Sequence, residues 1–94
     1  METTQARRLR GVFAGRVQGV FFRATAAELA REAGVRGFVR NEEDGTVYLE
    51  AEADGESLER FLEALRERYR GFIAEEKLSP VEPLGSEPGF EIRR

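Results

Sequence analysis

The nonapeptide Gly15-Arg16-Val17-Gln18-Gly19-Val20-Phe21-Phe22-Arg23 joins a strand-like run over residues 9–14 to a helical pattern over residues 22–33. Two glycines in such a loop let bare backbone amides converge on one point. The helix that follows directs its unpaired N–H groups and the positive end of its dipole at that point. Arg23 adds a planar, permanently charged group suited to phosphate oxygens. The loop therefore predicts an anion site that suits a phosphoryl group; a tight turn that uses glycine for backbone reasons is the alternative.

Around this loop, the spacing of apolar residues predicts an alternation of strands and helices. Apolar residues alternate in the strand segments, whereas Phe22 and Ala26 begin a repeat at helical spacing. Gly34 is suited to end the first helix, and Asp54 or Ser57 to cap the second. The expected elements are strands over residues 7–14, 35–40, 46–52 and 72–81, a short strand over 90–92, and helices over 22–33 and 58–69.

This order, βαββαβ with a short strand after it, defines an α+β fold. Two helices on one face of an antiparallel sheet of four long strands, plus the short C-terminal strand, make a sandwich of ferredoxin-like topology. Pro80 and Pro83 suit a sheet edge or a strand end, so the fourth long strand is expected at an edge. We expect a single domain over residues 1–94, with residues 1–6 as a flexible N-terminus.

Two absent residue types limit the chemistry. The sequence has no cysteine, which excludes disulfides, a thiolate nucleophile and zinc–sulfur sites. It also has no histidine, which removes the usual general base and the commonest transition-metal ligand. Phosphatase chemistry through a covalent cysteine or histidine intermediate is therefore excluded. We expect no metal and no cofactor.

Charge and composition bear on partners and location. The net charge of −3 argues against nonspecific nucleic-acid binding, and no apolar run approaches the ~20 residues that span a bilayer. The N-terminus lacks an apolar stretch of secretory type, so we expect a cytoplasmic monomer. Charged residues make up 35% of the chain while Asn41 is the only asparagine. Such a composition is typical of thermophiles and predicts a thermostable protein.

The loop resembles the signature of the acylphosphatase family, G-x-V-Q-G-V-x-F-R, at every fixed position from Gly15 to Arg23. A second stretch, Gly37-Phe38-Val39-Arg40-Asn41, resembles that family's other block: a glycine, an aromatic residue, two variable positions and an asparagine. Asp44-Gly45-Thr46-Val47 continues the block with the expected glycine and valine. The resemblance extends over nearly the whole chain and implies the same ferredoxin-like fold.

The resemblance also implies a reaction and a role for individual residues. The reaction is hydrolysis of a small-molecule acyl phosphate, a carboxylic–phosphoric mixed anhydride, to a carboxylate and inorganic phosphate. Arg23 matches the family's catalytic arginine, which binds the phosphoryl oxygens and stabilises their charge. Asn41 matches the catalytic asparagine, which orients the attacking water. The N–H groups of residues 16–20 are expected around the same oxygens. The whole predicted phosphate-binding loop is Gly15, Arg16, Val17, Gln18, Gly19 and Val20.

This reaction suits a chain without histidine. The leaving group is a carboxylate with a pKa near 4 in model acids, so it departs without being protonated and needs no general acid. What remains is to hold the phosphoryl group, offset its developing charge and place a water in line. The proton of that water passes either to a phosphoryl oxygen of the substrate or to Glu42, which is adjacent to Asn41.

Two other functions compete with hydrolysis. One is a non-catalytic phosphate- or nucleotide-sensing module that keeps the loop for binding. The other is an RNA-binding domain of the same topology, which needs exposed aromatic residues on the sheet and a basic surface. The two motifs and the negative net charge argue against the RNA-binding domain, whereas the sensing module remains the alternative to the hydrolase.

Overall fold

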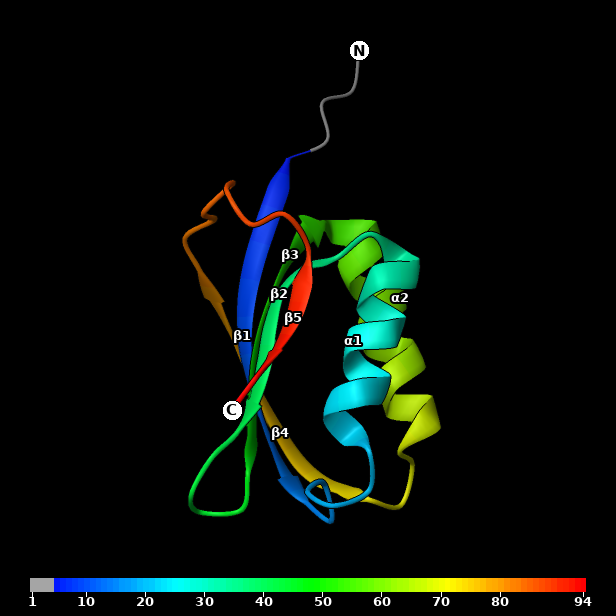
Figure 1. Cartoon of the computed structure of the whole chain (residues 1–94). Coiled ribbons are helices and arrows are strands. Elements are labelled where there is room, and N and C mark those ends of the chain that lie inside the picture. Colours follow the sequence, from blue (N-terminus) through cyan, green and yellow to red (C-terminus); the bar gives the residue numbers. More distant parts are fainter. Residues whose placement is uncertain (1–4) are drawn as a thin grey trace.

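The computed structural model describes residues 5–94. Figure 1 shows two helices packed against one face of a twisted sheet, whose other face carries no helix. The elements are β1 (Ala6–Gly15), α1 (Phe22–Ala33), β2 (Arg36–Asn41), β3 (Val47–Asp54), α2 (Gly55–Arg68), β4 (Ile73–Val81) and β5 (Phe90–Arg93). The expected α+β class and its order of elements are therefore confirmed.

The strands lie in the order β4-β1-β3-β2-β5. The four long strands are antiparallel to their long neighbours, as expected, and β4 with its Pro80 is at an edge. The short β5 runs parallel to β2, a pairing that the sequence pattern does not specify. Val47 at the start of β3 is opposite both Phe13 of β1 and Asn41 of β2. The C-terminal ends of β1 and β2 therefore lie at the same end of the sheet, on either side of the start of β3.

The observed bounds differ from the expected ones mainly at the N-terminus and at α2. β1 begins at Ala6, which pairs with Asp54, so the flexible N-terminus expected over residues 1–6 is wrong for Ala6; residues 1–4 of that segment lie outside the described residues. α2 begins at Gly55, because Asp54 is its N-cap and accepts the N–H of Ser57 at 2.8 Å. Asp54, not Ser57, is therefore the cap.

An aromatic row holds the start of α1 against the sheet. The ring of Phe22 lies 5.6 Å from that of Phe13 and 4.9 Å from that of Tyr69, measured between centroids. Phe22 and Phe13 are almost fully buried. α1 ends at Gly34, whose φ of 74° is readily available to glycine. In the part of the chain that the structure describes, no helix is long and apolar enough to cross a bilayer.

A buried ion-pair network lies on the helix-free face of the sheet. Arg8 of β1 contacts Glu52 of β3 at 2.9 Å and Glu87 at 2.7 Å. Glu52 also accepts the N–H groups of Leu84 and Gly85, at 2.8 and 2.9 Å. These contacts fasten the β4–β5 connection across the sheet, from one edge to the other, and so place β5 beside β2 (Figure 1).

Candidate active site

The loop between β1 and α1 presents a run of free backbone N–H groups. Within residues 5–94, the N–H groups of residues 17–20 donate no hydrogen bond to a backbone or side-chain acceptor. The first bond of α1 runs from Thr25 N–H to the carbonyl oxygen of Phe21, at 2.9 Å, and no side chain caps this helix end. Such unpaired N–H groups at a helix N-terminus favour a bound anion.

Gly15 and Arg16, by contrast, pack against Phe72 in the segment before β4. A Cβ atom at Gly15 would lie 2.3 Å from the carbonyl oxygen of Phe72, so only glycine fits there. The N–H of Arg16 donates to the same oxygen at 2.8 Å, and the Arg16 guanidinium lies 5.1 Å from the Phe72 ring centroid. The N–H of Arg16 is therefore unavailable to a ligand, and the expected donor set of residues 16–20 narrows to 17–20.

A pocket of about 290 Å³ lies where the loop, the first turn of α1, the end of β2 and β5 meet. It contains both side chains that the sequence motifs assign to catalysis, Arg23 and Asn41. Of the predicted loop, Val17 and Gly19 line it, whereas Gly15, Arg16, Gln18 and Val20 do not. The lining residues are Val17, Gly19, Phe21, Phe22, Arg23, Ala24, Asn41 and Ile92.

Arg23 is in the first turn of α1 and is fixed at one point only. Its Nη1 donates to the carbonyl oxygen of Arg93 in β5, at 3.1 Å. It takes part in none of the ion pairs found among residues 5–94. A guanidinium has five N–H donors, so most of them remain for an oxyanion in the pocket.

Asn41 is the last residue of β2 and carries the most informative atom of the site. Its Oδ1 is buried, yet it has no hydrogen-bond partner among the described residues. An unsatisfied buried carbonyl costs roughly 1–3 kcal/mol, so native structures seldom retain one without a reason. Asn41 lines the same pocket as Arg23, so its amide group is suited to bind a water molecule there.

Two side chains hold the loop in place from outside the pocket. Gln18 Nε2 donates to the carbonyl oxygens of Glu42 and Thr46, both at 2.9 Å, and so ties the loop to the β2–β3 turn. The hydroxyl of Tyr69 donates to the carbonyl oxygen of Val20 at 2.8 Å. Sequence reasoning missed Tyr69 because no spacing rule relates a residue after α2 to a loop before α1.

Glu42 does not line the pocket. Its carboxylate lies 2.6 Å from Nε of Arg40, and this ion pair raises the pKa of the Arg40 guanidinium. Glu42 therefore lies outside the pocket, with its carboxylate held by Arg40, and is not positioned to accept a proton from a water molecule in the pocket.

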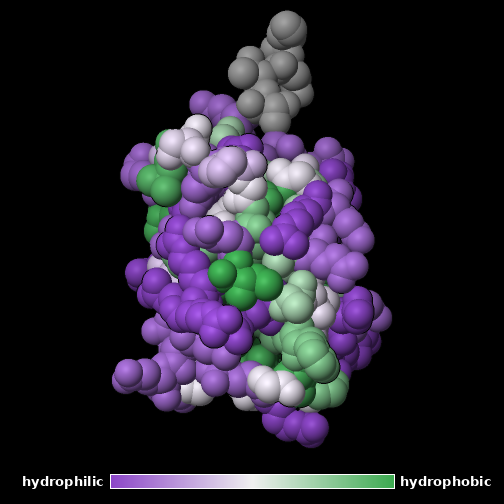
Figure 2. All heavy atoms as spheres, in the orientation of Figure 1, coloured by the Kyte–Doolittle hydropathy of each residue, from purple (hydrophilic) through white to green (hydrophobic). Residues whose placement is uncertain are grey.

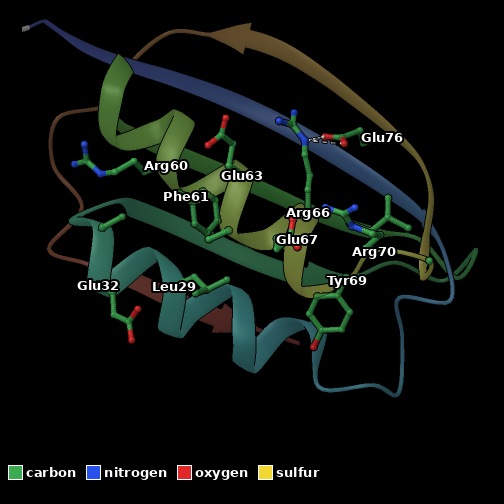
Figure 3. A pocket seen from close by; sticks show the side chains of 14 residues that line it. Leu29, Glu32, Arg60, Phe61, Glu63, Arg66, Glu67, Tyr69, Arg70 and Glu76 are labelled. Atoms are coloured by element: carbon green, nitrogen blue, oxygen red, sulfur yellow. Dashed lines mark hydrogen bonds and ion pairs between the residues drawn. The ribbon is translucent and has the colours of Figure 1, made fainter.

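A larger hollow, of about 1000 Å³, lies along α2 and contains none of the motif residues. Figure 3 shows its charged side chains, most of them on α2, with Glu76 of β4 across from Arg66. Arg66 pairs with Glu76 at 2.9 Å, and Arg70 pairs with Glu67. Arg60 pairs with Glu56 at 3.9 Å, so each arginine that lines the hollow has a carboxylate partner. Among residues 5–94, the hollow therefore offers no unpaired guanidinium to an anion, unlike the pocket that contains Arg23.

Comparison with known proteins shows the family to which this chain belongs. The family model described as Acylphosphatase matches residues 9–92. A curated acylphosphatase of Salinibacter ruber is 48% identical to the chain over 95 aligned residues, with both sequences covered completely. The chain therefore belongs to the acylphosphatase family, a family of hydrolases that act on acyl phosphates.

Solved structures agree. The crystal structure of acylphosphatase from Bacillus subtilis superposes with a TM-score of 0.85 at 28% identity, covering 94% of this chain and 99% of that one. An acylphosphatase from Coxiella burnetii has a TM-score of 0.84 at 25% identity, covering 99% of this chain and 100% of that one. The resemblance stated from the two sequence motifs is thereby confirmed.

Proposed function

We propose that the chain hydrolyses acyl phosphates without a metal ion, by in-line attack of a water molecule on phosphorus. The observation that carries this proposal is that Asn41, whose Oδ1 is buried without a partner among the described residues, lines the same pocket as Arg23. A cation that donates hydrogen bonds to the phosphoryl oxygens and an acceptor that orients a water molecule are the two groups that assist such an attack.

Arg23 and the loop bind the phosphoryl group in this proposal. The free N–H groups of residues 17–20 and the guanidinium of Arg23 surround its oxygens, where they stabilise the charge that grows in the transition state. The positive end of α1 acts in the same direction. Binding is therefore strongest when the oxygens carry the most charge, which is the requirement for catalysis.

Asn41 orients the nucleophile. Its Oδ1 accepts a hydrogen bond from the attacking water, so that an oxygen lone pair points at phosphorus. As the new P–O bond forms, the bond from phosphorus to the acyl oxygen breaks, and its electron pair leaves with the carboxylate. The proton of the water passes to a phosphoryl oxygen. The products are a carboxylate and inorganic phosphate, and no general acid takes part.

Release of phosphate from an aroyl phosphate in the presence of EDTA tests this proposal. We expect wild-type turnover to persist in EDTA. Arg23→Ala should lower kcat/KM at least 1,000-fold through both binding and turnover, while Asn41→Ala should lower kcat about 100-fold with KM little changed. Dependence on a metal, or full activity of Asn41→Ala, would contradict the mechanism. Phosphate binding without any turnover would favour the alternative, a non-catalytic sensing module.

We further propose that the chain acts as a monomer in the cytoplasm, with no nucleic acid or membrane as partner. Arg23 and Asn41 meet within one chain, so the proposed chemistry needs no residue from a second copy. The net charge of −3 disfavours nucleic acid. Thermostability, expected from the charge-rich composition, also belongs to this proposal. Analytical ultracentrifugation and a thermal melt test the oligomeric state and the thermostability.

A further inference from the structure

We infer that Phe21 and Ile92 form a binding surface for the acyl group of the substrate, and that the pocket selects acyl phosphates with a large, apolar acyl group such as an aroyl group. This inference rests on the proposed function. It concerns the acyl group, which leaves as a carboxylate, whereas Arg23 and Asn41 act on the phosphoryl group, which the water attacks.

Phe21 is a large apolar residue that the core does not use. Its side chain is 82% exposed, while that of its neighbour Phe22 is 1% exposed. Ile92 of β5 is 43% exposed. Both Phe21 and Ile92 line the pocket that holds Arg23 and Asn41. Figure 2 shows hydrophobic side chains gathered on the surface between β5 and the start of α1.

The backbone of Phe21 adds a second, independent observation. Its φ of 62° and ψ of 25° place it in the left-handed region, and it is the only residue other than glycine with a positive φ among residues 5–94. Glycine adopts this conformation without strain, so a phenylalanine here is retained at a cost in stability. Strain of this kind is characteristic of functional sites, where the side chain contributes something that glycine lacks.

The charges of the pocket limit the class of acyl group. Arg23 is the only charged residue among those that line the pocket, and in the proposed function its guanidinium binds the phosphoryl group. An acyl group with a second carboxylate or an ammonium group therefore meets Phe21 and Ile92, which cannot satisfy a charge. An aromatic acyl group instead stacks on the Phe21 ring and removes apolar surface from water.

The size of the pocket agrees with this assignment. A volume of about 290 Å³ lies at the lower end of ligand sites. It equals roughly ten times the ~30 Å³ that a water molecule occupies in the liquid, so a tetrahedral phosphoryl group fills only part of it. The rest of the pocket, whose lining includes Phe21 and Ile92, has room for an acyl group with a single ring.

Kinetics with two substrates, benzoyl phosphate and acetyl phosphate, test the inference. The measured quantity is the ratio of their kcat/KM values in wild type, Phe21→Ala, Phe21→Tyr and Ile92→Ala. We expect the ratio to fall about tenfold in Phe21→Ala, mainly through KM for benzoyl phosphate, and about threefold in Ile92→Ala. Phe21→Tyr keeps the ring and should stay within about twofold of wild type. Leu84→Ala, which removes an exposed apolar side chain outside the pocket, is the matched control and should leave the ratio unchanged.

An unchanged ratio in Phe21→Ala overturns the inference, and so does an equal loss with both substrates, since that result means that Phe21 acts only through the shape of the loop. Affinities for benzylphosphonate and methylphosphonate, measured by calorimetry, separate this inference from the proposed function. If the wild type hydrolyses neither substrate, the proposed function fails, while a preference for benzylphosphonate that disappears in Phe21→Ala still supports the apolar surface. A wild type without that preference overturns it.

Discussion

Gln18 Nε2 lies 2.9 Å from the carbonyl oxygen of Glu42, the residue that follows Asn41. Through this hydrogen bond and the equal one to Thr46, the β1–α1 loop is joined to the turn that follows Asn41. These bonds help to fix the distance between the N–H groups that we propose bind the anion and the amide that we propose orients the water. We therefore expect Gln18, which does not itself line the pocket, to act as a positioning residue.

Replacing Gln18 with alanine should misalign the two halves of the site. We expect kcat to fall 10- to 100-fold with KM changed less than about threefold, because a small displacement affects the attack geometry more than binding. Loss of two hydrogen bonds to carbonyl oxygens should also cost about 1–2 kcal/mol of stability. The control is Gln5→Ala, at an exposed glutamine before β1. Wild-type kcat in Gln18→Ala would contradict this role.

Tyr69→Phe should loosen the loop at its other end. The variant keeps the aromatic contacts with Phe22 and Phe72 but loses the hydrogen bond to the carbonyl oxygen of Val20. We expect a stability loss of about 1 kcal/mol and a three- to tenfold weaker inhibition by inorganic phosphate. Tyr48→Phe is the matched control, because the Tyr48 hydroxyl binds Glu50 on the helix-free face. The same weakening in both variants would indicate a general loss of stability rather than an effect on the loop.

Substitutions at Phe21 measure the backbone strain directly. Because φ is positive there, Phe21→Gly should be about 1 kcal/mol more stable than Phe21→Ala. The order should reverse at Glu28, an exposed position within α1. There the free energy of unfolding of Glu28→Ala should be about 1 kcal/mol higher than that of Glu28→Gly. Chemical denaturation of the four variants provides the comparison. Equal stability of the two Phe21 variants would show that no strain is stored in the loop.

The Arg8–Glu52 network predicts a specific acid sensitivity. Burial opposes ionisation of Glu52, but the N–H groups of Leu84 and Gly85 and the Arg8 guanidinium outweigh it and lower its pKa from 4.5 to about 2. A carboxyl whose pKa is lowered by folding adds stability above its unfolded pKa and loses that contribution as pH falls through the folded value. Up to about 3 kcal/mol should therefore disappear between pH 4.5 and 2.

Glu52→Gln isolates this contribution. The variant should lose about 3 kcal/mol at pH 7, because the buried Arg8 and the N–H groups of Leu84 and Gly85 lose the charge of Glu52. Arg8 keeps its pairs with Glu50 and Glu87. The stability of the variant should change less between pH 4.5 and 2. Glu67→Gln removes an exposed pair with Arg70 and should change stability by less than about 0.5 kcal/mol. Urea unfolding across this pH range supplies the measurement. An acid-unfolding profile of Glu52→Gln identical to wild type would rule out Glu52 as the titrating group.

Short-range sequence patterns predicted most of the fold and part of the candidate site. Apolar spacing and Gly34 gave α1 from Phe22 to Ala33, and the two motifs placed Arg23 and Asn41 together. Contacts between residues far apart in sequence were not predictable. The parallel pairing of β5, the Tyr69 bond to the loop and the burial of Arg8 depend on how the finished sheet brings distant segments together.

The expectation that the N–H of Arg16 is free to bind the substrate was wrong for the same reason, because it depends on a contact with a distant segment. A glycine-rich loop before a helix predicts that its N–H groups are free, but only the packing of β4 beside β1 shows that the N–H of Arg16 is bound to Phe72. Phe21, at a variable position of the motif, likewise gave no sequence signal for its conformation or its exposure.

The most direct test of the central claim is an amide NMR titration of the wild-type chain with inorganic phosphate, repeated with Arg23→Ala. We predict that the amide signals of residues 17–20 shift together with one dissociation constant, that the Arg16 amide shifts far less, and that Arg23→Ala abolishes the response. Shifts centred on the hollow along α2, or a response of the loop that does not require Arg23, would contradict the account.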